Sequence, residues 1–276
     1  MQAKKSLGQN FLRDVTVLDK IIQAANLTSA DNIIEIGPGE GVLSRELSAR
    51  AGRLIMVEKD EKLSANLAKN FKFQISNFKS TSNDKILNSE NKAAVLVGDI
   101  LEINLPELIE RNDFQKYKLI ANIPYYITSP IIRLFLETAY PPTEMILMVQ
   151  REVAERICAT AGQMSILAVS VQYYAQPEIL FNVEKKSFWP VPEVDSAVIR
   201  IVPNKKNISQ EESRTFFHLV KAGFSAKRKT LVNNLSASLQ LDKKIVAEKI
   251  EKAGLAPAVR AQELSLADWK KLMKLL

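Results

Sequence analysis

Short apolar runs alternate with amphipathic stretches along most of the chain. Runs of four or five mainly apolar residues lie at 33–36, 53–57, 94–97, 118–121 and 145–149. Such runs are typical of strands that are buried on both faces of a parallel sheet. Between them, apolar residues recur at helical spacing and predict helices at 14–25, 42–51, 60–71 and 152–160. Strands that alternate with helices indicate an α/β fold.

The last part of the chain has a different pattern. Two extended segments, 178–183 and 197–202, flank a proline-rich stretch, Ser187–Ser196, whose prolines favour extended backbone. Beyond Pro203 only helical periodicity remains, and it predicts helices at 216–222, 230–239, 243–253 and 266–275. We therefore predict a Rossmann-like α/β domain over residues 1–203 and a small α-helical domain over residues 204–276.

Positive charge is concentrated in the predicted helical domain. Residues 204–276 contain fifteen Lys and Arg against seven Asp and Glu, which is a net charge of +8. The whole chain carries +7, which leaves residues 1–203 with −1. A basic part of this kind predicts a polyanionic partner, most simply a nucleic acid, although a basic surface also serves solubility.

Other features of the composition limit the function classes. The chain of 276 residues has 46% hydrophobic and 25% charged residues, as globular proteins do. It has no apolar leader after Met1 and no run of about 18 apolar residues, so we expect a cytoplasmic protein without a membrane partner. Its single cysteine, Cys158, excludes an internal disulfide and cannot alone bind a metal. We therefore expect no metal, and we expect a monomer.

Three glycines follow the first predicted strand directly. Gly37, Gly39 and Gly41 form a G-x-G-x-G turn between that strand and a helix. In a doubly wound sheet such a turn lets a ligand approach the backbone at the carboxyl end of a strand, so we expect Gly37 and Gly39 to contact a cofactor. Dinucleotide binders have G-x-G-x-x-G instead, and the shorter spacing therefore favours a smaller cofactor without a pyrophosphate.

Polar residues end three further strands of the predicted sheet. Glu58, Asp99 and Asn122 each stand at a carboxyl end, and together with the glycine turn they are expected to line one crevice. Glu58 is placed to accept hydrogen bonds from ribose hydroxyls, and Asp99 to accept one from an adenine amine. Each residue alone is more often a solvated strand end, but the ordered set predicts a site for S-adenosylmethionine.

The most specific motif is Asn122-Ile-Pro-Tyr125. Elsewhere it would be a turn with a core tyrosine, but beside a methyl donor it fits methylation of a planar amine. The Asn122 oxygen and the carbonyl of Ile123 or Pro124 can accept both N6 hydrogens of an adenine, which shifts electron density to N6 and aims it. Tyr125 can stack on the base. We therefore predict that Asn122, Pro124 and Tyr125 are catalytic.

These motifs, with several others, resemble those of the ribosomal RNA adenine dimethylases. The matching segments are Gln9-Asn-Phe-Leu12, Glu35–Gly41, Gly98-Asp99, Asn122–Tyr125, Phe188–Ala197 and Arg228–Leu235. The resemblance spans nearly the whole chain and is greatest to the branch that dimethylates two adjacent adenosines near the 3′ end of 16S rRNA. Two departures from that branch are Ile123, where Leu is usual, and a longer segment around Ser76–Asn91.

The resemblance implies a fold, a cofactor, a partner and site residues. The fold is a Rossmann-like S-adenosylmethionine-dependent methyltransferase sheet with a small C-terminal α-helical domain. The partner is 16S rRNA in the small ribosomal subunit or its precursor. The N-terminal segment, residues 1–30, is implied to cover the cofactor. The residues implied to contact S-adenosylmethionine are Asn10, Leu12, Gly37, Glu58, Asp99 and Asn122.

RNA docking is predicted for the basic helical domain. Lys221, Lys227, Arg228 and Lys229 surround a helix start there, and their charges predict contacts with rRNA phosphates, although lysine stems often cover apolar surface instead. Two other functions stay open. One is an adenine N6-methyltransferase that acts on large-subunit rRNA or on DNA, and the other is a non-catalytic ribosome assembly factor. The intact Asn122–Tyr125 motif argues against the second.

Overall fold

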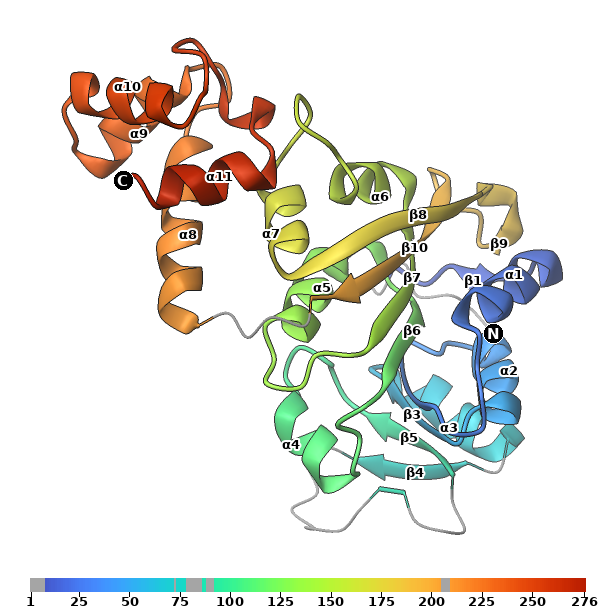
Figure 1. Cartoon of the computed structure of the whole chain (residues 1–276). Coiled ribbons are helices and arrows are strands. Elements are labelled where there is room, and N and C mark those ends of the chain that lie inside the picture. The colour runs from blue at the N-terminus through green and yellow to red at the C-terminus, as the bar shows by residue number, and fades with distance from the viewer. Residues whose placement is uncertain (1–7, 72, 78–85, 88–91, 205–208) are drawn as a thin grey trace. The chain divides into compact units, whose positions relative to one another are not determined.

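The computed structural model describes residues 8–71, 73–77, 86–87, 92–204 and 209–276 (Figure 1). The chain divides into two compact units. Unit 1 comprises Met1–Ala154 and Pro177–Pro203, and unit 2 comprises Glu155–Gln176 and Asn204–Leu276. This division differs from the boundary expected after residue 203, because apolar side chains of the segment Glu155–Gln176 pack into the core of unit 2.

Unit 1 is built on an eight-stranded sheet with the strand order β4-β5-β3-β2-β6-β7-β10-β8. Its strands are β2 (Asn32–Ile36), β3 (Arg53–Glu58), β4 (Gln74–Asn77), β5 (Ala93–Val97), β6 (Lys118–Asn122), β7 (Glu144–Gln150), β8 (Ala175–Val183) and β10 (Ser196–Pro203). The first six strands in this spatial order, which are β4, β5, β3, β2, β6 and β7, are parallel to one another. Strand β10 is antiparallel to β7. The order of the strands switches direction between β2 and β6, which is where open α/β sheets bind ligands.

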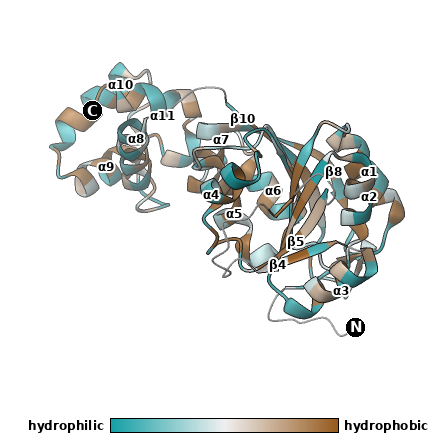
Figure 2. Ribbon diagram, turned by 90° about the horizontal axis from the view of Figure 1, so that it is seen from below, coloured by the Kyte–Doolittle hydropathy of each residue, from teal (hydrophilic) through white to brown (hydrophobic). Residues whose placement is uncertain are grey.

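Helices cover both faces of this sheet (Figure 1). The helices are α1 (Val15–Ala25), α2 (Val42–Arg50) and α3 (Glu61–Phe71) on one face, α4 (Leu105–Arg111) and α5 (Thr128–Leu136) on the other, and α6 (Arg151–Ile157) after β7. Alternate strand residues serve the two faces: Ile33 packs with α1 and α2, while its neighbour Ile34 is buried on the opposite side. Figure 2 shows the apolar strands between helices that carry both polar and apolar colours. The central strands β2, β3, β5, β6 and β7 are thus buried on both faces, as their continuous apolar runs predict.

Two features of unit 1 differ from the sequence-based expectations. A pair of short strands, β1 (Phe11–Leu12) and β9 (Phe188–Trp189), forms an antiparallel ribbon in which Phe11 lies opposite Trp189. Two residues are too few to give a periodic pattern. Gln74–Asn77, for which the sequence analysis predicts no strand, forms the edge strand β4 beside β5. Residues 78–85 and 88–91 of the longer segment lie outside the described residues.

Unit 2 has a separate apolar core. Its helices are α7 (Ile166–Tyr174), α8 (Gln210–Gly223), α9 (Leu231–Leu239), α10 (Lys243–Lys252) and α11 (Leu266–Met273). Trp269 is fully buried at its centre, and the rings of Tyr173 and Phe216 stack with centroids 4.2 Å apart. Glycine is required at 223, since a Cβ there would lie 2.4 Å from the Trp269 ring. Helical packing around large aromatic side chains therefore stabilises this unit.

Short 3-10 turns occur at Tyr125–Ile127, Lys185–Ser187 and Ala261–Glu263. Among the described residues, no helix combines the length and the apolar character that crossing a membrane requires.

Candidate functional site

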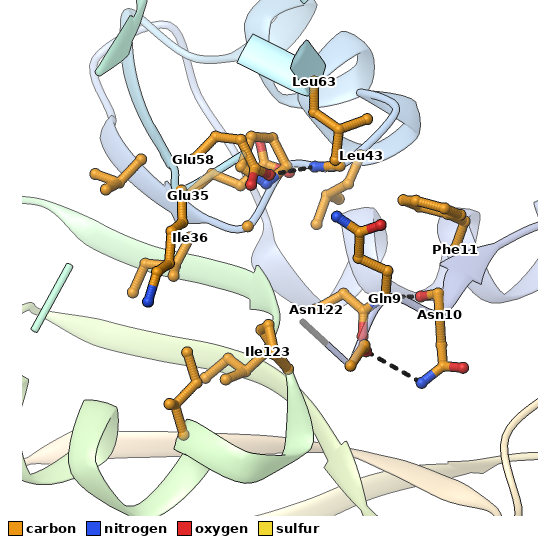
Figure 3. A pocket seen from close by; sticks show the side chains of 18 of the residues that line it. Gln9, Asn10, Phe11, Glu35, Ile36, Leu43, Glu58, Leu63, Asn122 and Ile123 are labelled. Carbon is orange, nitrogen blue, oxygen red and sulfur yellow. Dashed lines mark hydrogen bonds between the residues drawn. The ribbon is translucent and has the colours of Figure 1, made fainter. Parts of the chain in front are cut away.

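The carboxyl ends of four neighbouring strands form the wall of one pocket. The strands β5, β3, β2 and β6 are adjacent in this order, and each is followed or ended by a polar residue or a glycine turn. Figure 3 shows Asn10, Glu58 and Asn122 around this pocket. The pocket lining brings together all the cofactor-binding and catalytic candidates. They are Asn10, Leu12, Gly37, Gly39, Glu58, Asp99, Asn122, Pro124 and Tyr125.

The glycine turn brings main-chain atoms to the pocket. Gly37, Gly39 and Gly41 have φ angles of 63°, 61° and 83°, in the left-handed region that favours glycine. A Cβ on Gly39 would lie 3.1 Å from the Phe11 ring, which closes over the turn. At Gly41 a Cβ would lie 2.5 Å from side-chain atoms of α3. Backbone conformation and packing therefore both require glycine in this turn.

Glu58 is held in one orientation by main-chain donors. Its Oε1 accepts a hydrogen bond from the Asp60 N–H at 2.8 Å, and its Oε2 accepts one from the Gly39 N–H at 3.2 Å. The residue is only 6% exposed. Burial raises the pKa of Glu58, and these hydrogen bonds oppose the rise because they favour the carboxylate. Each carboxylate oxygen has a further lone pair that can accept from a ligand hydroxyl.

Asp99 forms an ion pair at the same pocket. Lys59 Nζ donates to its Oδ2 at 2.8 Å, and the Leu101 N–H donates to its Oδ1 at 3.0 Å. Burial acts to raise the pKa of Asp99, but these donors outweigh it, so the pKa lies below its ordinary value. The sequence analysis does not single out Lys59, which also lines the pocket. Any ligand amine at Asp99 therefore shares the carboxylate with this ammonium group.

Asn122 is hydrogen-bonded to the N-terminal segment. Its Nδ2 donates to the main-chain oxygen of Asn10 at 3.2 Å, and the Asn10 side-chain amide donates to the Gly8 oxygen at 3.2 Å. The described part of the N-terminal segment, from Gly8 to Leu12, lines the pocket. Because Nδ2 faces Asn10, the oxygen Oδ1 lies at the opposite edge of the planar amide group and can accept from a substrate.

The chain turns sharply after Asn122. The Pro124 carbonyl accepts a hydrogen bond from the Ile127 N–H at 3.1 Å and so closes the 3-10 turn. The Tyr125 hydroxyl lies 2.7 Å from the hydroxyl of Ser196, a buried residue at the start of β10. Burial raises the pKa of Tyr125, so its hydroxyl stays protonated at neutral pH. Tyr125 can thus position a base but cannot act as a strong general base.

Glu35 is a buried carboxyl group that the sequence analysis does not assign to the site. It lies in β2, lines the pocket and is 1% exposed, and its Oε2 has no hydrogen-bond partner among the described residues. Burial raises the pKa of Glu35 to about 8, and the neighbouring Glu58 carboxylate adds to this effect. The available signal was an acid inside the apolar run Ile33–Ile36, because a buried carboxyl group is costly.

The charges of the pocket fit S-adenosylmethionine. Among the described residues that line it, Glu40, Glu58 and Asp99 supply three carboxylates against the single ammonium of Lys59, while the raised pKa of Glu35 keeps that fourth carboxyl group mostly protonated at neutral pH. Such a set disfavours a phosphate and favours a ligand with positive charge, hydroxyls and an amine. S-adenosylmethionine has all three and no phosphate. Within the described ranges, no three metal-ligating side chains come together to hold a metal ion.

Comparison with known proteins identifies the family. A family model described as ribosomal RNA adenine dimethylase matches residues 1–276. The chain belongs to this family. A relative from Dehalococcoides mccartyi, named ribosomal RNA small subunit methyltransferase A, is 42% identical over 273 residues, which are 99% of this chain and 88% of the relative. A protein of the same name from Clostridioides difficile is 37% identical and is matched over 99% of this chain and 90% of its own length.

Solved structures share the fold of this family member. A dimethyladenosine transferase from Plasmodium falciparum has a TM-score of 0.75 at 26% identity, with 95% of each chain covered. The 23S rRNA methyltransferase ErmE has a TM-score of 0.74 at 24% identity, with 97% of this chain and 99% of that chain covered. The family and the Rossmann-like methyltransferase fold expected from the sequence are thereby confirmed. The chain is an rRNA adenine dimethyltransferase that uses S-adenosylmethionine.

The basic residues expected to dock RNA lie in unit 2 of this family member. Lys221 lies in the last turn of α8, and Lys227, Arg228 and Lys229 lie between α8 and α9. All four side chains are exposed. The connection between α8 and α9 is anchored by Asn234, whose Nδ2 donates to the main-chain oxygens of Gly223 and Ala226. The four charges are therefore free to face solvent on a well-anchored segment.

Proposed function

We propose that the chain transfers methyl groups to N6 of two adjacent adenosines near the 3′ end of 16S rRNA, giving N6,N6-dimethyladenosine during small-subunit biogenesis. The substrate is 16S rRNA in the small subunit or its precursor, and the enzyme acts as a monomer in the cytoplasm. The relatives named ribosomal RNA small subunit methyltransferase A support the choice of subunit. The observation that carries the chemistry is the Asn122 amide, fixed by Asn10 beside an acidic pocket.

When bound, S-adenosylmethionine supplies an electrophilic methyl group on a sulfonium sulfur. Glu58 accepts hydrogen bonds from the ribose hydroxyls, for which its carboxylate is already oriented by the Asp60 and Gly39 N–H groups. Asp99 accepts from the adenine amine of the cofactor. Gly37 and Gly39 place main-chain atoms, without side chains, against the amino-acid part. Asn10 and Leu12 cover the cofactor from the N-terminal segment.

The target adenine is held by Asn122 and the chain that follows it. Asn122 Oδ1 accepts one N6 hydrogen, and a main-chain carbonyl accepts the other. Of the two carbonyls considered, that of Pro124 already accepts the Ile127 N–H, so the Ile123 carbonyl is the better acceptor. These contacts draw electron density onto N6 and aim its lone pair, while Tyr125 stacks on the ring. Positioning and charge stabilisation therefore account for the catalysis.

A strong base is not required in this site. N6 becomes cationic as it is methylated, and a cationic aniline-like nitrogen loses its proton readily to water. The properties of Tyr125 are consistent with a reaction that needs no strong base, because its hydroxyl has a raised pKa and is hydrogen-bonded to Ser196. After the first methylation one N–H remains, so one of the two acceptors continues to hold the base. The same site can therefore perform the second transfer.

In the proposed function, Lys221, Lys227, Arg228 and Lys229 bind rRNA phosphates. Phosphate contacts from clustered Lys and Arg supply most of the affinity of such complexes and make it depend on salt. This docking brings the target adenosine to the enzyme, where it leaves its stack to enter the pocket.

The proposed function is tested by the position of the methyl groups. Purified enzyme is incubated with labelled S-adenosylmethionine and with 30S or 50S subunits that lack adenine dimethylation, and the rRNA digests are analysed by mass spectrometry. Dimethyladenosine at two adjacent adenosines near the 3′ end of 16S rRNA is the expected result. Label in 23S rRNA would instead support the large-subunit alternative, and binding without label would support an assembly factor.

A further inference from the structure

One of the two tryptophans of the chain has an exposed side chain, whereas aromatic side chains are usually buried. Trp189 in β9 is 47% exposed, whereas the other tryptophan, Trp269 in unit 2, is fully buried. Two apolar residues that follow it, Val191 and Val194, are 57% and 46% exposed. An exposed apolar segment of this kind commonly marks a binding surface. Neither the cofactor site nor the target-base contacts described above use it.

The register of the β1–β9 ribbon places Trp189 next to the pocket. Trp189 lies directly opposite Phe11, and residues opposite each other in an antiparallel pair project to the same face. Phe11 lines the pocket and lies over Gly39. Leu12 and Phe188 project to the other face and pack in the apolar core, where Leu12 also borders the pocket. The Trp189 ring therefore lies on the same face of the ribbon as Phe11, but it is exposed and does not form part of the buried pocket.

The Trp189 ring is held by an arginine. The guanidinium carbon of Arg13 lies 5.8 Å from the ring centroid, in a cation–π arrangement. Arg13 Nη1 lies 2.7 Å from Oε2 of Glu40, a residue of the pocket lining, and the Arg13 N–H donates to the Ser187 oxygen at 2.8 Å. The exposed ring is thus fixed to the pocket rim from one side, and it presents an ordered apolar surface rather than a free side chain.

The far end of the same segment is fixed at the target-base site. Ser196, which follows Val191 and Val194, bonds to the Tyr125 hydroxyl at 2.7 Å. Next to it, Asp195 accepts from the Lys185 N–H at 3.0 Å. The segment from Trp189 to Ser196 therefore begins beside the pocket wall that Phe11 forms. It ends at Ser196, which contacts Tyr125, the residue proposed to stack on the target adenine. This segment is therefore a surface that an RNA strand can follow when its base enters between these two points.

We propose that Trp189 stacks on the nucleobase adjacent to the target adenosine. This inference rests on the proposed function, and it assigns the surface to the RNA strand. When a base leaves its stack, its neighbour loses one stacking partner, and an ordered indole can replace that partner. Stacking on an aromatic side chain tolerates any base, which suits a site that must accept two adjacent adenosines in turn. Arg13 adds a positive charge near the strand and keeps the ring in place.

The first test is kinetic. Methylation of undermethylated 30S subunits is measured for the parent, Trp189→Ala and Trp189→Phe, together with the affinity for S-adenosylmethionine. Loss of one base stack predicts a KM for 30S subunits that is about five- to a hundred-fold higher in Trp189→Ala. Trp189→Phe retains a ring and should stay within a few-fold of the parent. Cofactor affinity should be unchanged in both variants.

The second test does not depend on removing the ring. A photo-crosslinking phenylalanine derivative is placed at position 189, and the crosslinked nucleotide is mapped on 16S rRNA by primer extension. A crosslink to a nucleotide next to a methylated adenosine is expected. A crosslink elsewhere, an unchanged KM in Trp189→Ala, or an effect on cofactor affinity alone overturns the inference, the last because Trp189 would then only cover the cofactor. Failure of the parent to methylate 16S rRNA would count against the proposed function instead.

Discussion

Asn10 and Asn122, which are 112 residues apart in the chain, are joined by a hydrogen bond of 3.2 Å. The donor is the side-chain amide of the residue proposed to hold the target amine, and the acceptor is the main chain of a segment that lines the cofactor pocket. The bond fixes which way the Asn122 amide faces, because Nδ2 must point to Asn10. Placement of the N-terminal segment and orientation of the Asn122 side-chain oxygen are therefore coupled.

Asn122→Ala is predicted to abolish most of the methyl transfer without abolishing binding. The contact of Oδ1 with N6 matters most as charge develops on the nitrogen, so the single-turnover rate should fall by about a hundred-fold or more. Affinities for S-adenosylmethionine and for 30S subunits should change much less. If 30S affinity collapses while the rate of the bound complex survives, Asn122 is a binding residue and the proposed chemistry is wrong.

Glu58→Ala is predicted to weaken cofactor binding while the fold is retained. A carboxylate that accepts from ligand hydroxyls contributes about 1.5–3 kcal/mol per charged hydrogen bond, so affinity for S-adenosylmethionine should fall by roughly ten- to a hundred-fold. Isothermal titration calorimetry measures this directly. Glu61→Ala is the matched control, since Glu61 is an exposed acid in the first turn of α3. Equal affinities of the Glu58 variant and the control for S-adenosylmethionine would show that Glu58 does not contribute to cofactor binding.

The strand ends were predictable because parallel strands share one edge. Once 33–36, 53–57, 94–97 and 118–121 are recognised as strands, the positions of Glu58 and Asp99 follow from the topology of a doubly wound sheet. The structure places these strands side by side and brings the residues into one pocket. Their individual contacts with cofactor stay predictions. The family, the fold and the enzyme class inferred from the motifs are confirmed by the family match.

Other parts of the site depend on contacts between distant segments. The β1–β9 ribbon joins residues that are far apart in sequence and is too short to leave a periodic pattern. Ser196 matters because the fold brings its hydroxyl to Tyr125, and Lys59 because it reaches Asp99. Similarly, Glu155–Gln176 reads as a continuation of the α/β pattern, yet its apolar side chains pack in unit 2. Tertiary packing, which local patterns do not encode, decides each of these cases.

Glu35 is predicted to make stability depend on pH. Its ordinary pKa is 4.5, and burial raises it to about 8 in the folded protein. Between these values the folded protein keeps a proton that the unfolded chain has lost. Protonation therefore favours folding, and the contribution of Glu35 is fully present below 4.5 and is lost as the pH rises to about 8. Glu35→Gln, which mimics the protonated group, removes this dependence.

Urea denaturation of the parent and Glu35→Gln across this pH range checks the prediction. The free energy of unfolding of the variant should rise relative to that of the parent with increasing pH, by up to about 1.4 kcal/mol per pH unit. The comparison between the two proteins cancels the titration of all other groups. A difference that is constant with pH would show that Glu35 is already ionised in the folded protein.

Replacing Lys227, Arg228 and Lys229 with Gln is predicted to weaken binding to 30S subunits and to reduce its salt dependence. Each cation that contacts a phosphate releases counterions on binding, so the slope of log affinity against log salt should fall by up to about three. These three exposed residues precede α9, on a segment anchored by Asn234. Affinity for S-adenosylmethionine should not change, because the three residues are not part of the pocket lining.

A second triple variant separates a specific docking surface from net charge. Lys243, Lys244 and Lys252 are exposed residues of α10 in the same unit, and their replacement by Gln removes the same charge. A direct phosphate contact predicts a large fall in slope for the first triple variant and a small one for the second, in salt-titrated binding to 30S subunits. Equal falls would mean that only the overall charge of the unit attracts RNA. An unchanged slope in the first variant would move the docking surface away from the segment before α9, because contacts that release no counterions cannot be phosphate contacts.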